Sequence, residues 1–393
     1  MTVVTNMTQA YRIIKRMDLA PEWDGDYRGA AREAVISVLE GRMHAWIDGY
    51  LDGMGRRMAD RRNGSFSRHL LTELGDIELA VPRTRQVSAI EIVRSYARRS
   101  PEVDRLILAC FVLGISTRKV ATALLPILRE AVSAATVSRV VHQLDTAVAA
   151  FHRRLLKKPY RFLVFDGVVL KRRTGAGAAK RVVLVALGIT PEGKKEVIDF
   201  MVAHAESQAA WDTFLSDLYR RGLDGQGLEM IITDGGKGLL AALPFVYPHI
   251  PFQRCWVHKT RNIMNMIRKQ DWEMVKRDLH RISHAPGIRE ARGALGRFSR
   301  RWQVRYPKAV ASLLMHEEDL LTFFRIQDPL LWSQIRTTNA IERRFREVRR
   351  RTRPMGVFSD RTSMERILYA VFMYENHKHT TATPFLIEVT QNN

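Results

Sequence analysis

The stretch Arg161-Phe-Leu-Val-Phe-Asp-Gly-Val-Val-Leu170 is an apolar run that a single carboxylate, Asp166, interrupts. A second apolar run, Met230-Ile-Ile-Thr-Asp-Gly-Gly-Lys237, leads into Asp234. Short apolar runs rich in β-branched and aromatic residues are typical of buried β-strands. A carboxylate inside or at the end of such a strand is costly unless another group compensates its charge. The two runs therefore predict strands that carry functional carboxylates.

The surrounding sequence predicts a mixed sheet. The turn Pro191-Glu-Gly-Lys194 would join two strands as a hairpin, and a helix at about 208–222 would precede a later strand. Hairpin strands followed by strand–helix alternation indicate a mixed α+β fold with covering helices. The expected strands are 161–170, 181–190, 195–202, 228–233 and, shorter, 252–256.

The first 60 residues are predicted to be mostly helical, with an amphipathic pattern over residues 30–60. Alternating residues from Leu70 to Val81 predict a β-hairpin centred on Gly75-Asp76. Farther on, Ser100-Pro101-Glu102 marks the start of a helix that should end at Gly114. A later helix is expected from about residue 133 to 152.

Residues 101–155 thus show helix, glycine-containing turn, helix and a third helix bearing Ser, Thr and Arg. This order matches a helix-turn-helix DNA-reading unit, in which the third helix would contact the major groove. A plain helical bundle is the alternative interpretation. The DNA-contact residues expected here are Ser116, Arg118, Lys119, Thr136, Ser138 and Arg139.

Charge favours a polyanionic partner. The 63 Lys and Arg residues outnumber the 41 Asp and Glu residues, which gives a net charge of +22. Nucleic acid fits this excess better than an anionic membrane surface, because neither end of the chain forms a long basic amphipathic helix. Two cysteines are too few for a disulfide framework, and no signal peptide or membrane-spanning stretch is visible. We therefore expect a soluble cytoplasmic protein associated with the nucleoid, without membrane contact.

A third carboxylate, Glu342, stands in the arginine-rich segment Thr338-Asn-Ala-Ile-Glu-Arg-Arg-Phe-Arg346. Adjacent strands lie about 4.8 Å apart, so Asp166 and Asp234 could share a metal pair that a helix bearing Glu342 would close. Two Mg²⁺ ions about 4 Å apart activate the attacking oxygen and stabilise the leaving oxygen in phosphodiester chemistry. The cofactor expected is therefore two Mg²⁺ ions, for which Mn²⁺ would substitute, with all three carboxylates as catalytic metal ligands.

Each carboxylate also has an ordinary structural interpretation. Asp166 could bond to a turn, and Asp234 could form an Asx-turn or cap a helix. Asn339 and Glu342 have the spacing of a capping box, with Asn339 as the N-cap and Glu342 at the third helical position. The three carboxylates together favour a catalytic metal site, although no single one of them does so by itself.

These segments resemble those of the Mutator-type family of bacterial insertion-sequence transposases, which carry an Asp-Asp-Glu triad on a ribonuclease H-like fold. The resemblance covers about residues 60–380. Alanine at 340 and glycine at 236 depart from the family pattern, which commonly has proline and histidine there. The matching segments are Phe165-Asp-Gly-Val168, Thr233-Asp-Gly-Gly-Lys-Gly-Leu239, Gln253-Arg-Cys-Trp-Val-His258, Glu206-Ser-Gln-Ala-Ala-Trp211, Leu79-Ala-Val-Pro-Arg83, Thr338-Asn-Ala-Ile-Glu-Arg-Arg344 and Arg350-Arg-Thr-Arg-Pro-Met-Gly-Val-Phe358.

The residue patterns and the resemblance together predict three regions. Residues 1–98 would be an N-terminal helical region with a β-hairpin for dimerisation or DNA contact, and residues 99–157 a helix-turn-helix-like DNA-binding region. Residues 158–393 would be the ribonuclease H-like catalytic domain, a mixed five-stranded sheet with helices. An all-helical insertion at about 257–330 would interrupt this domain before the helix that bears Glu342.

Two further groups of residues are candidates for supporting roles. Cys255 and His258 could suggest zinc, but a structural zinc site needs four ligands, so a structural role near the site is favoured. Seven arginines surround Glu342, and phosphate contacts explain them better than a solvated charge run. The DNA contacts expected in this part are Lys237, Arg343, Arg346, Arg350 and Arg353.

The sequence therefore predicts a transposase that cuts DNA at the terminal inverted repeats of its element and joins the ends to target DNA. Its partners would be double-stranded DNA and further copies of itself, as a homodimer or a higher oligomer, because two ends must meet. Two alternatives that act on DNA remain open, and a membrane-surface protein is a distant third. One is a nuclease of the same fold that does not join strands. The other is a domesticated regulator that binds DNA without catalysis.

Overall fold

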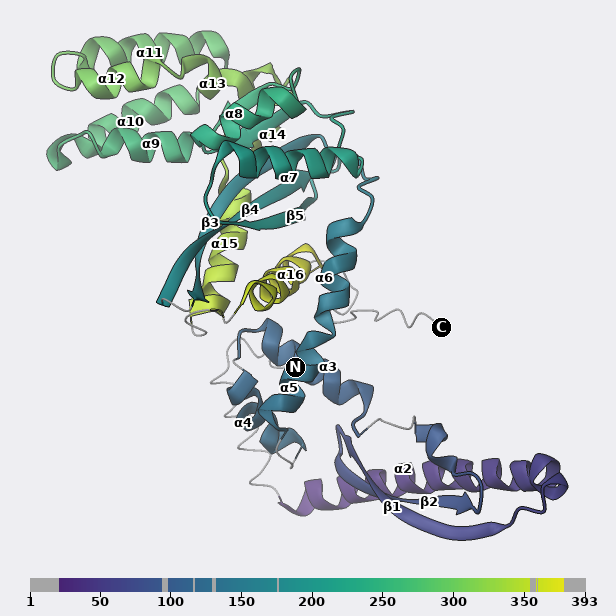
Figure 1. The fold of residues 1–393 in the computed structure, drawn as a ribbon. Coiled ribbons are helices and arrows are strands. Elements are labelled where there is room, and N and C mark those ends of the chain that lie inside the picture. The colour runs from purple at the N-terminus through teal and green to yellow at the C-terminus, as the bar shows by residue number, and fades with distance from the viewer. Residues whose placement is uncertain are drawn as a thin grey trace. The chain divides into compact units, whose positions relative to one another are not determined.

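A computed structural model describes residues 21–93, 98–115, 117–128, 132–174, 177–353, 358 and 360–377. Within these ranges, the side chains of residues 21–28, 117, 118, 127 and 172–174 are not described. The chain divides into two compact units, with the boundary between Gln143 and Leu144. Figure 1 shows the strands and helices of each unit.

The first unit contains a helix packed on a hairpin (Figure 1). Helix α2 (Pro21–Tyr50) continues into a short π-helix, η1 (Leu51–Gly55), and strands β1 (Arg62–Thr72) and β2 (Gly75–Thr84) pair antiparallel. Met43 and Ile47 on α2 are fully buried against apolar residues of the hairpin. The hairpin predicted from the alternation is confirmed. It turns between Thr72 and Gly75, slightly before the predicted centre.

A short 3₁₀ helix, η2 (Ala89–Val93), and three helices complete the first unit: α3 (Pro101–Val112), α4 (Thr117–Leu128) and α5 (Ala134–His142). Ser100 caps α3 by accepting a hydrogen bond from the Val103 amide, as its position before Pro101 predicts. Gly114, at φ +92°, ends this segment in the left-handed region that glycine tolerates. The single helix expected over 133–152 is wrong, because the helical hydrogen bonding of α5 ends at Gln143 and α6 (Leu144–Arg153) follows as a separate helix.

The second unit is built on a five-stranded mixed sheet in the order β5-β4-β3-β6-β7. Strands β3 to β5 pair antiparallel, whereas β6 runs parallel to β3 and β7 parallel to β6. The mixed α+β class and the five strands expected from the sequence are confirmed. The strands are β3 (Phe162–Thr174), β4 (Gly177–Ile189), β5 (Lys195–Ala203), β6 (Met230–Thr233) and β7 (Phe252–Arg254).

Helices cover the two faces of this sheet. On one face, α7 (Gln208–Arg220) and α8 (Lys237–Val246) bury a core that includes Leu163, Phe165 and Trp211. On the other face, α15 (Asn339–Thr352) packs on β3, and α16 (Arg361–His377) packs on β5. The Asn376 side chain fastens α16 to β5 by bonding both the amide and the carbonyl of Val197. Successive strand residues alternate between faces, so Asp166 lies on the side opposite Phe165, where α15 packs.

Between β7 and α15, the described chain is entirely helical and extends beside the sheet (Figure 1). Gln253, fully buried, joins this segment to the sheet: its amide nitrogen donates to the Leu320 carbonyl, and its oxygen accepts from the Phe323 amide. The helices are α9 (Trp256–Met264), η3 (Lys269–Asp271), α10 (Trp272–Ser283), α11 (Ile288–Trp302), α12 (Pro307–Leu314), α13 (Glu317–Leu321), η4 (Thr322–Arg325) and α14 (Pro329–Ile335).

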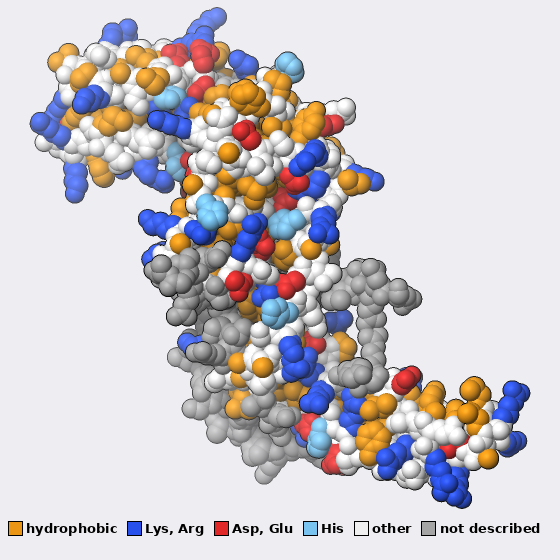
Figure 2. Space-filling model, viewed as in Figure 1, with side chains coloured by type: hydrophobic (Ala, Val, Ile, Leu, Met, Phe, Trp, Pro, Cys, Tyr) orange, Lys and Arg blue, Asp and Glu red, His pale blue; other side chains and the backbone are white. Residues whose placement is uncertain are grey.

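Basic side chains are exposed on both units. On the face drawn in Figure 2, Lys and Arg side chains are spread over α9–α12, and also over α2 and its hairpin. Within the described ranges, no helix combines the length and apolar character needed to cross a membrane.

Candidate active site

The strand register places Asp166 and Asp234 side by side. Phe165 of β3 pairs with Thr233 of the parallel strand β6, and each aspartate follows its paired residue directly. Because paired strands lie about 4.8 Å apart, the two backbones bring Asp166, inside β3, beside Asp234, which directly follows β6. The sequence prediction that these residues share a site therefore agrees with the topology.

Asp166 is 7% exposed, and its Oδ1 accepts a hydrogen bond from the Gly167 amide at 2.7 Å. Burial and, after it, the nearby charge of Asp234 raise the pKa of this carboxyl to about 7. Glu342 contributes in the same direction, whereas the Gly167 bond and His258 oppose it. An acidic site in which carboxylates repel one another favours a cation.

Asp234 forms the Asx-turn that its sequence also allowed. Its Oδ1 accepts from the Gly236 amide at 2.8 Å, and Gly235 takes a φ of +90°. A Cβ at position 235 would lie 1.8 Å from Nη1 of Arg254, so only glycine fits this turn. Helix α8 begins after Gly236 without a side-chain cap, so the helix-cap interpretation of Asp234 is wrong.

Glu342 is on the helix that covers the Asp166 side of the sheet. The capping-box interpretation is wrong: Thr338, not Asn339, is the N-cap of α15, and no side chain caps this helix. Glu342 lies one residue deeper in the helix than that motif requires, so its carboxylate is not used to close the helix end. Its Oε1 lies 3.5 Å from Nε2 of His258.

Cys255 and His258 connect the start of α9 to the start of α15. The buried Cys255 sulfur accepts from both the amide and the hydroxyl of Thr338 at 3.3 Å, and His258 Nδ1 lies 3.4 Å from that hydroxyl. The hydrogen bond to Cys255 raises the pKa of His258 to about 9 against the effect of burial, with help from the charges of Cys255, Asp166 and Asp234. Burial would raise the pKa of Cys255, but the bonds from His258 and Thr338 outweigh it and lower the value.

A fourth carboxylate, Glu206, lies at the same site and was not among the predicted catalytic residues. It lies just before α7, whose N-cap is Ser207. A Cβ on Gly167 would lie 3.3 Å from Oε2 of Glu206, and one on Gly236 would lie 3.1 Å from its Oε1. Partial burial and the charge of Asp234 raise the pKa of Glu206. The sequence signal was the motif from Glu206 to Trp211, which carried no chemistry by itself.

The described side chains do not form a ready-made metal-binding cluster. Among the residues that the structure describes, no three His, Cys, Asp or Glu side chains gather closely enough to hold one ion. The donor chemistry nevertheless fits Mg²⁺, which is held in proteins by one or two carboxylates together with waters and substrate phosphates. Asp166 and Asp234 supply such a pair.

The basic residues near the site separate into exposed and buried sets. Arg351 is 3% exposed and bonds Glu347, and Arg344 donates to the Lys195 carbonyl, so neither is available to a ligand. Arg350 is exposed but also pairs with Glu347 at 2.6 Å. The predicted contacts of this unit that are exposed are Lys237, Arg343, Arg346, Arg350 and Arg353.

In the first unit, two predicted DNA-contact residues, Lys119 and Arg139, are exposed, whereas Thr136 and Ser138 are half-buried. Thr136 is engaged in the helix start, where its amide donates to the Ser133 hydroxyl. Two other predicted contacts cannot be placed: Ser116 lies outside the described residues, and so does the side chain of Arg118.

These features define the class of the protein: an α+β enzyme with an acidic site beneath an arginine-rich helix. A family model described as "Transposase, Mutator family" matches residues 1–382. The chain belongs to the Mutator family of transposases, as the sequence motifs predicted.

Curated relatives agree. The chain is 31% identical over 367 residues to the transposase for insertion sequence element IS905 of Lactococcus lactis, across 92% of each chain. It is 34% identical over 317 residues to the transposase for element IS256 in transposon Tn4001 of Staphylococcus aureus, across 80% of each. To the transposase for element IST2 of Acidithiobacillus ferrooxidans it is 44% identical over 169 residues, which span 43% of this chain and 56% of the relative.

Proposed function

We propose that this transposase cuts DNA at the terminal inverted repeats of its element and transfers the ends to target DNA, with Asp166, Asp234 and Glu342 as the catalytic carboxylates. The observation that carries the proposal is the Phe165–Thr233 pairing, because Asp166 and Asp234 directly follow these two residues and the helix of Glu342 packs on β3. The interaction of Asp166 with the charges of both other carboxylates supports it.

Asp166 and Asp234 would hold two Mg²⁺ ions, or Mn²⁺ in their place, and Glu342 would complete the second ion's ligands. Such ions, when bound, stabilise the attacking and leaving oxygens of phosphodiester exchange. The residues of the chain orient the reaction: the Gly167 amide fixes Asp166, the Gly236 amide fixes Asp234, and His258 lies against Glu342. Water would first break the phosphodiester at the element end and release a 3′-hydroxyl. That hydroxyl would then attack a second phosphodiester without a covalent protein intermediate.

The architecture proposed for this reaction has three parts. The sheet of the second unit and its helices would form a ribonuclease H-like core in residues 158–393, with α9–α14 as its insertion. Helices α3, α4 and α5 would be the helix-turn-helix that reads the repeat, within residues 99–157. Residues 1–98 would contribute to dimerisation or DNA contact. A homodimer or higher oligomer in the nucleoid would bring two element ends together.

An excision and joining assay in cells tests this function. The gene is supplied with its native flanking DNA as wild type and as Asp166→Asn, Asp234→Asn and Glu342→Gln. Glu273→Gln, on the exposed surface of α10, is the matched carboxylate control. Joined ends are expected from wild type and the control alone.

Each other outcome assigns a different function. Cleaved but never joined ends from wild type would identify a nuclease of this fold. Binding of the flanks by all five proteins without any junctions would contradict the catalytic proposal and favour a regulator.

A further inference from the structure

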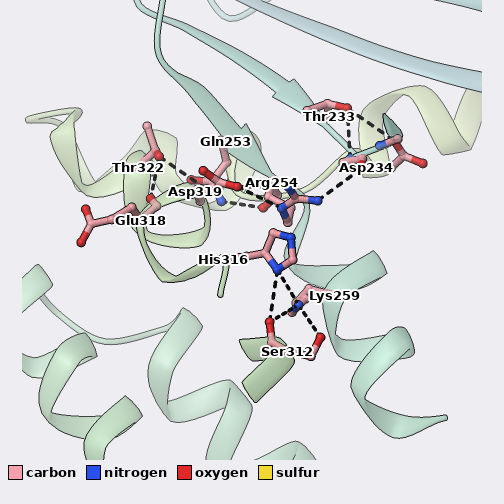
Figure 3. Close-up of polar contacts among 12 residues, drawn as sticks. Thr233, Asp234, Gln253, Arg254, Lys259, Ser312, His316, Glu318, Asp319 and Thr322 are labelled. Atoms are coloured by element: carbon pink, nitrogen blue, oxygen red, sulfur yellow. Dashed lines mark hydrogen bonds and ion pairs between the residues drawn. The ribbon is translucent and has the colours of Figure 1, made fainter. Parts of the chain in front are cut away.

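A pocket of about 420 Å³ opens beside Asp234, between the end of the sheet and the helical segment. Helix α9 supplies one wall, and the end of α12 with His316 supplies another (Figure 3). None of the predicted catalytic residues except Asp234 lines it. The volume lies in the range of pockets that take a small molecule, roughly 300–1,000 Å³.

A buried lysine without an acidic partner lies in this pocket. Lys259 is 5% exposed, and its Nζ donates to the carbonyl and hydroxyl oxygens of Ser312 at 2.6 and 2.9 Å. Nζ also lies 3.1 Å from Nδ1 of His316 (Figure 3). Within the described ranges, no Asp or Glu pairs with Lys259. The three protons of Nζ are used on these neutral acceptors, and the charge of Asp319 offsets the effect of burial only in part. A buried cation held by neutral acceptors is costly, so an anion that replaced one of these contacts would be favoured.

The neighbouring cation is already engaged. Arg254 pairs with Asp319 at 3.0 Å and donates to the Gly235 carbonyl at 3.3 Å. It therefore forms a fixed wall between the Asp234 turn and α13. Burial is the main cause that lowers the pKa of Lys259, and the charge of Arg254 is the second. Lys259 is the lining cation whose charge an incoming ligand would compensate.

The opposite wall suits a nucleobase. Asn262 and Asn265 line the pocket from α9 at a spacing that puts them on one helix face. Their amides both donate and accept hydrogen bonds, as the edges of bases do. Met266, 42% exposed, adds a polarizable apolar surface beside them.

We propose that this pocket holds one unpaired nucleotide of the DNA strand that is cut, with its phosphate at Lys259 and its base against Asn262, Asn265 and Met266. This inference rests on the proposed function. A paired base belongs to a duplex that is far too wide for the pocket, so the nucleotide must leave the base stack. Unstacking has a free-energy cost, which is smallest for a base that is already unpaired. In return, the fixed nucleotide would set the position of the neighbouring scissile phosphate at Asp234.

The test uses the full-length protein and duplexes of the element end in which 2-aminopurine replaces each base near the cleavage site in turn. Ca²⁺ replaces Mg²⁺ to stop cleavage. Unstacking of the probe raises its fluorescence, so one position should show a severalfold rise when wild-type protein is added. Lys259→Met and the double variant Asn262→Ala/Asn265→Ala should each reduce that rise to the level of the free duplex. Lys308→Met, on the exposed surface of α12, should retain it.

The double variant keeps the test decisive if Lys259→Met fails to fold, because both asparagines are exposed. A parallel reaction with Mg²⁺ and unmodified DNA separates the two proposals. If wild type cuts the DNA but no position brightens, or if both variants brighten the same position as wild type, the pocket proposal is wrong and the proposed function stands. If wild type binds the DNA and does not cut it, the proposed function itself fails.

Discussion

Nε2 of His258 lies 3.5 Å from Oε1 of Glu342, although helices α10 to α14 separate the two residues in the chain. The same imidazole lies against Thr338 at the start of α15, so one side chain of α9 contacts both the helix end and the carboxylate. This contact makes the helical segment a part of the acidic site.

His258→Gln should therefore slow DNA cleavage by roughly 10- to 100-fold, the usual effect of losing a residue that orients a metal ligand. The amide removes the positive charge but keeps a hydrogen-bonding group of similar reach. Cleavage rates at saturating protein and binding of the uncleaved duplex would be measured together. Unchanged cleavage, or a loss explained by weaker DNA binding alone, would show that the contact has no orienting role.

Asp166 should make the metal-free protein less stable as the pH rises. Its pKa is raised from 3.8 to about 7, so the folded state holds this proton more tightly than the unfolded chain. The stabilisation is complete below about pH 4 and is lost as the pH rises through 7. In a chelator, the melting temperature of wild type relative to Asp166→Asn should fall between pH 5 and 8.

Mg²⁺ at pH 8 should restore the wild-type melting temperature and leave Asp166→Asn nearly unchanged, because the ion neutralises the repelling carboxylates. Glu273→Gln is the control and should follow wild type in every buffer. If the melting temperature of wild type rose relative to that of Asp166→Asn as the pH increased in chelator, the pKa of Asp166 would not be raised in the folded protein.

Gly236→Ala tests the crowding of carboxylates around the Asp234 turn. The added Cβ would lie 3.1 Å from Oε1 of Glu206 and 3.3 Å from Oδ1 of Asp234, while a φ of −55° suits alanine. The carboxylates must give by a few tenths of an ångström, and we expect a loss of cleavage of no more than about tenfold with little change in melting temperature.

Gly296→Ala in α11 is the matched control, since its Cβ would meet nothing within 4 Å. It should keep full cleavage and gain up to about 1 kcal/mol of stability. Full activity of Gly236→Ala would mean that the positions of Glu206 and Asp234 do not matter to the reaction.

Lys259 should make the stability of the protein depend on pH in the direction opposite to that expected for Asp166. Burial lowers its pKa from 10.5 to about 8, so the unfolded chain binds this proton more tightly. Wild type should gain stability relative to Lys259→Met as the pH rises from 8 towards 10.5. Urea midpoints at pH 7 and 10 measure the difference, and Lys308→Met should show none. A difference that is constant across this range would show that Lys259 is not a buried cation.

Local patterns predicted the elements well. The apolar runs around Asp166 and Asp234 became β3 and β6, and the turn at Pro191 joins β4 to β5. These signals are short-range, since strand composition and turn chemistry depend on neighbouring residues. The sequence did not predict that β3 lies between β4 and β6, because strand pairing depends on contacts between distant segments.

The missed features are long-range for the same reason. Glu206 joins the site only because α7 begins beside Gly167 of β3 and the turn that follows β6, and Lys259 gains its pocket only when α12 folds back on α9. The capping-box error had a local cause: Asn339 and Thr338 are both acceptable caps, and packing at Cys255 selects Thr338 as the first residue outside the helix.

The most direct test of the central claim is cleavage of a duplex whose scissile phosphate carries sulfur in place of one non-bridging oxygen. Hard Mg²⁺ binds sulfur poorly, whereas softer Mn²⁺ tolerates it. Wild type should cut the ordinary duplex with Mg²⁺, leave a 3′-hydroxyl, cut one sulfur diastereomer slowly with Mg²⁺ and regain activity with Mn²⁺. Asp166→Asn and Asp234→Asn should cut neither substrate with either ion. Cleavage in chelator, or by either variant at the wild-type rate, would contradict the account.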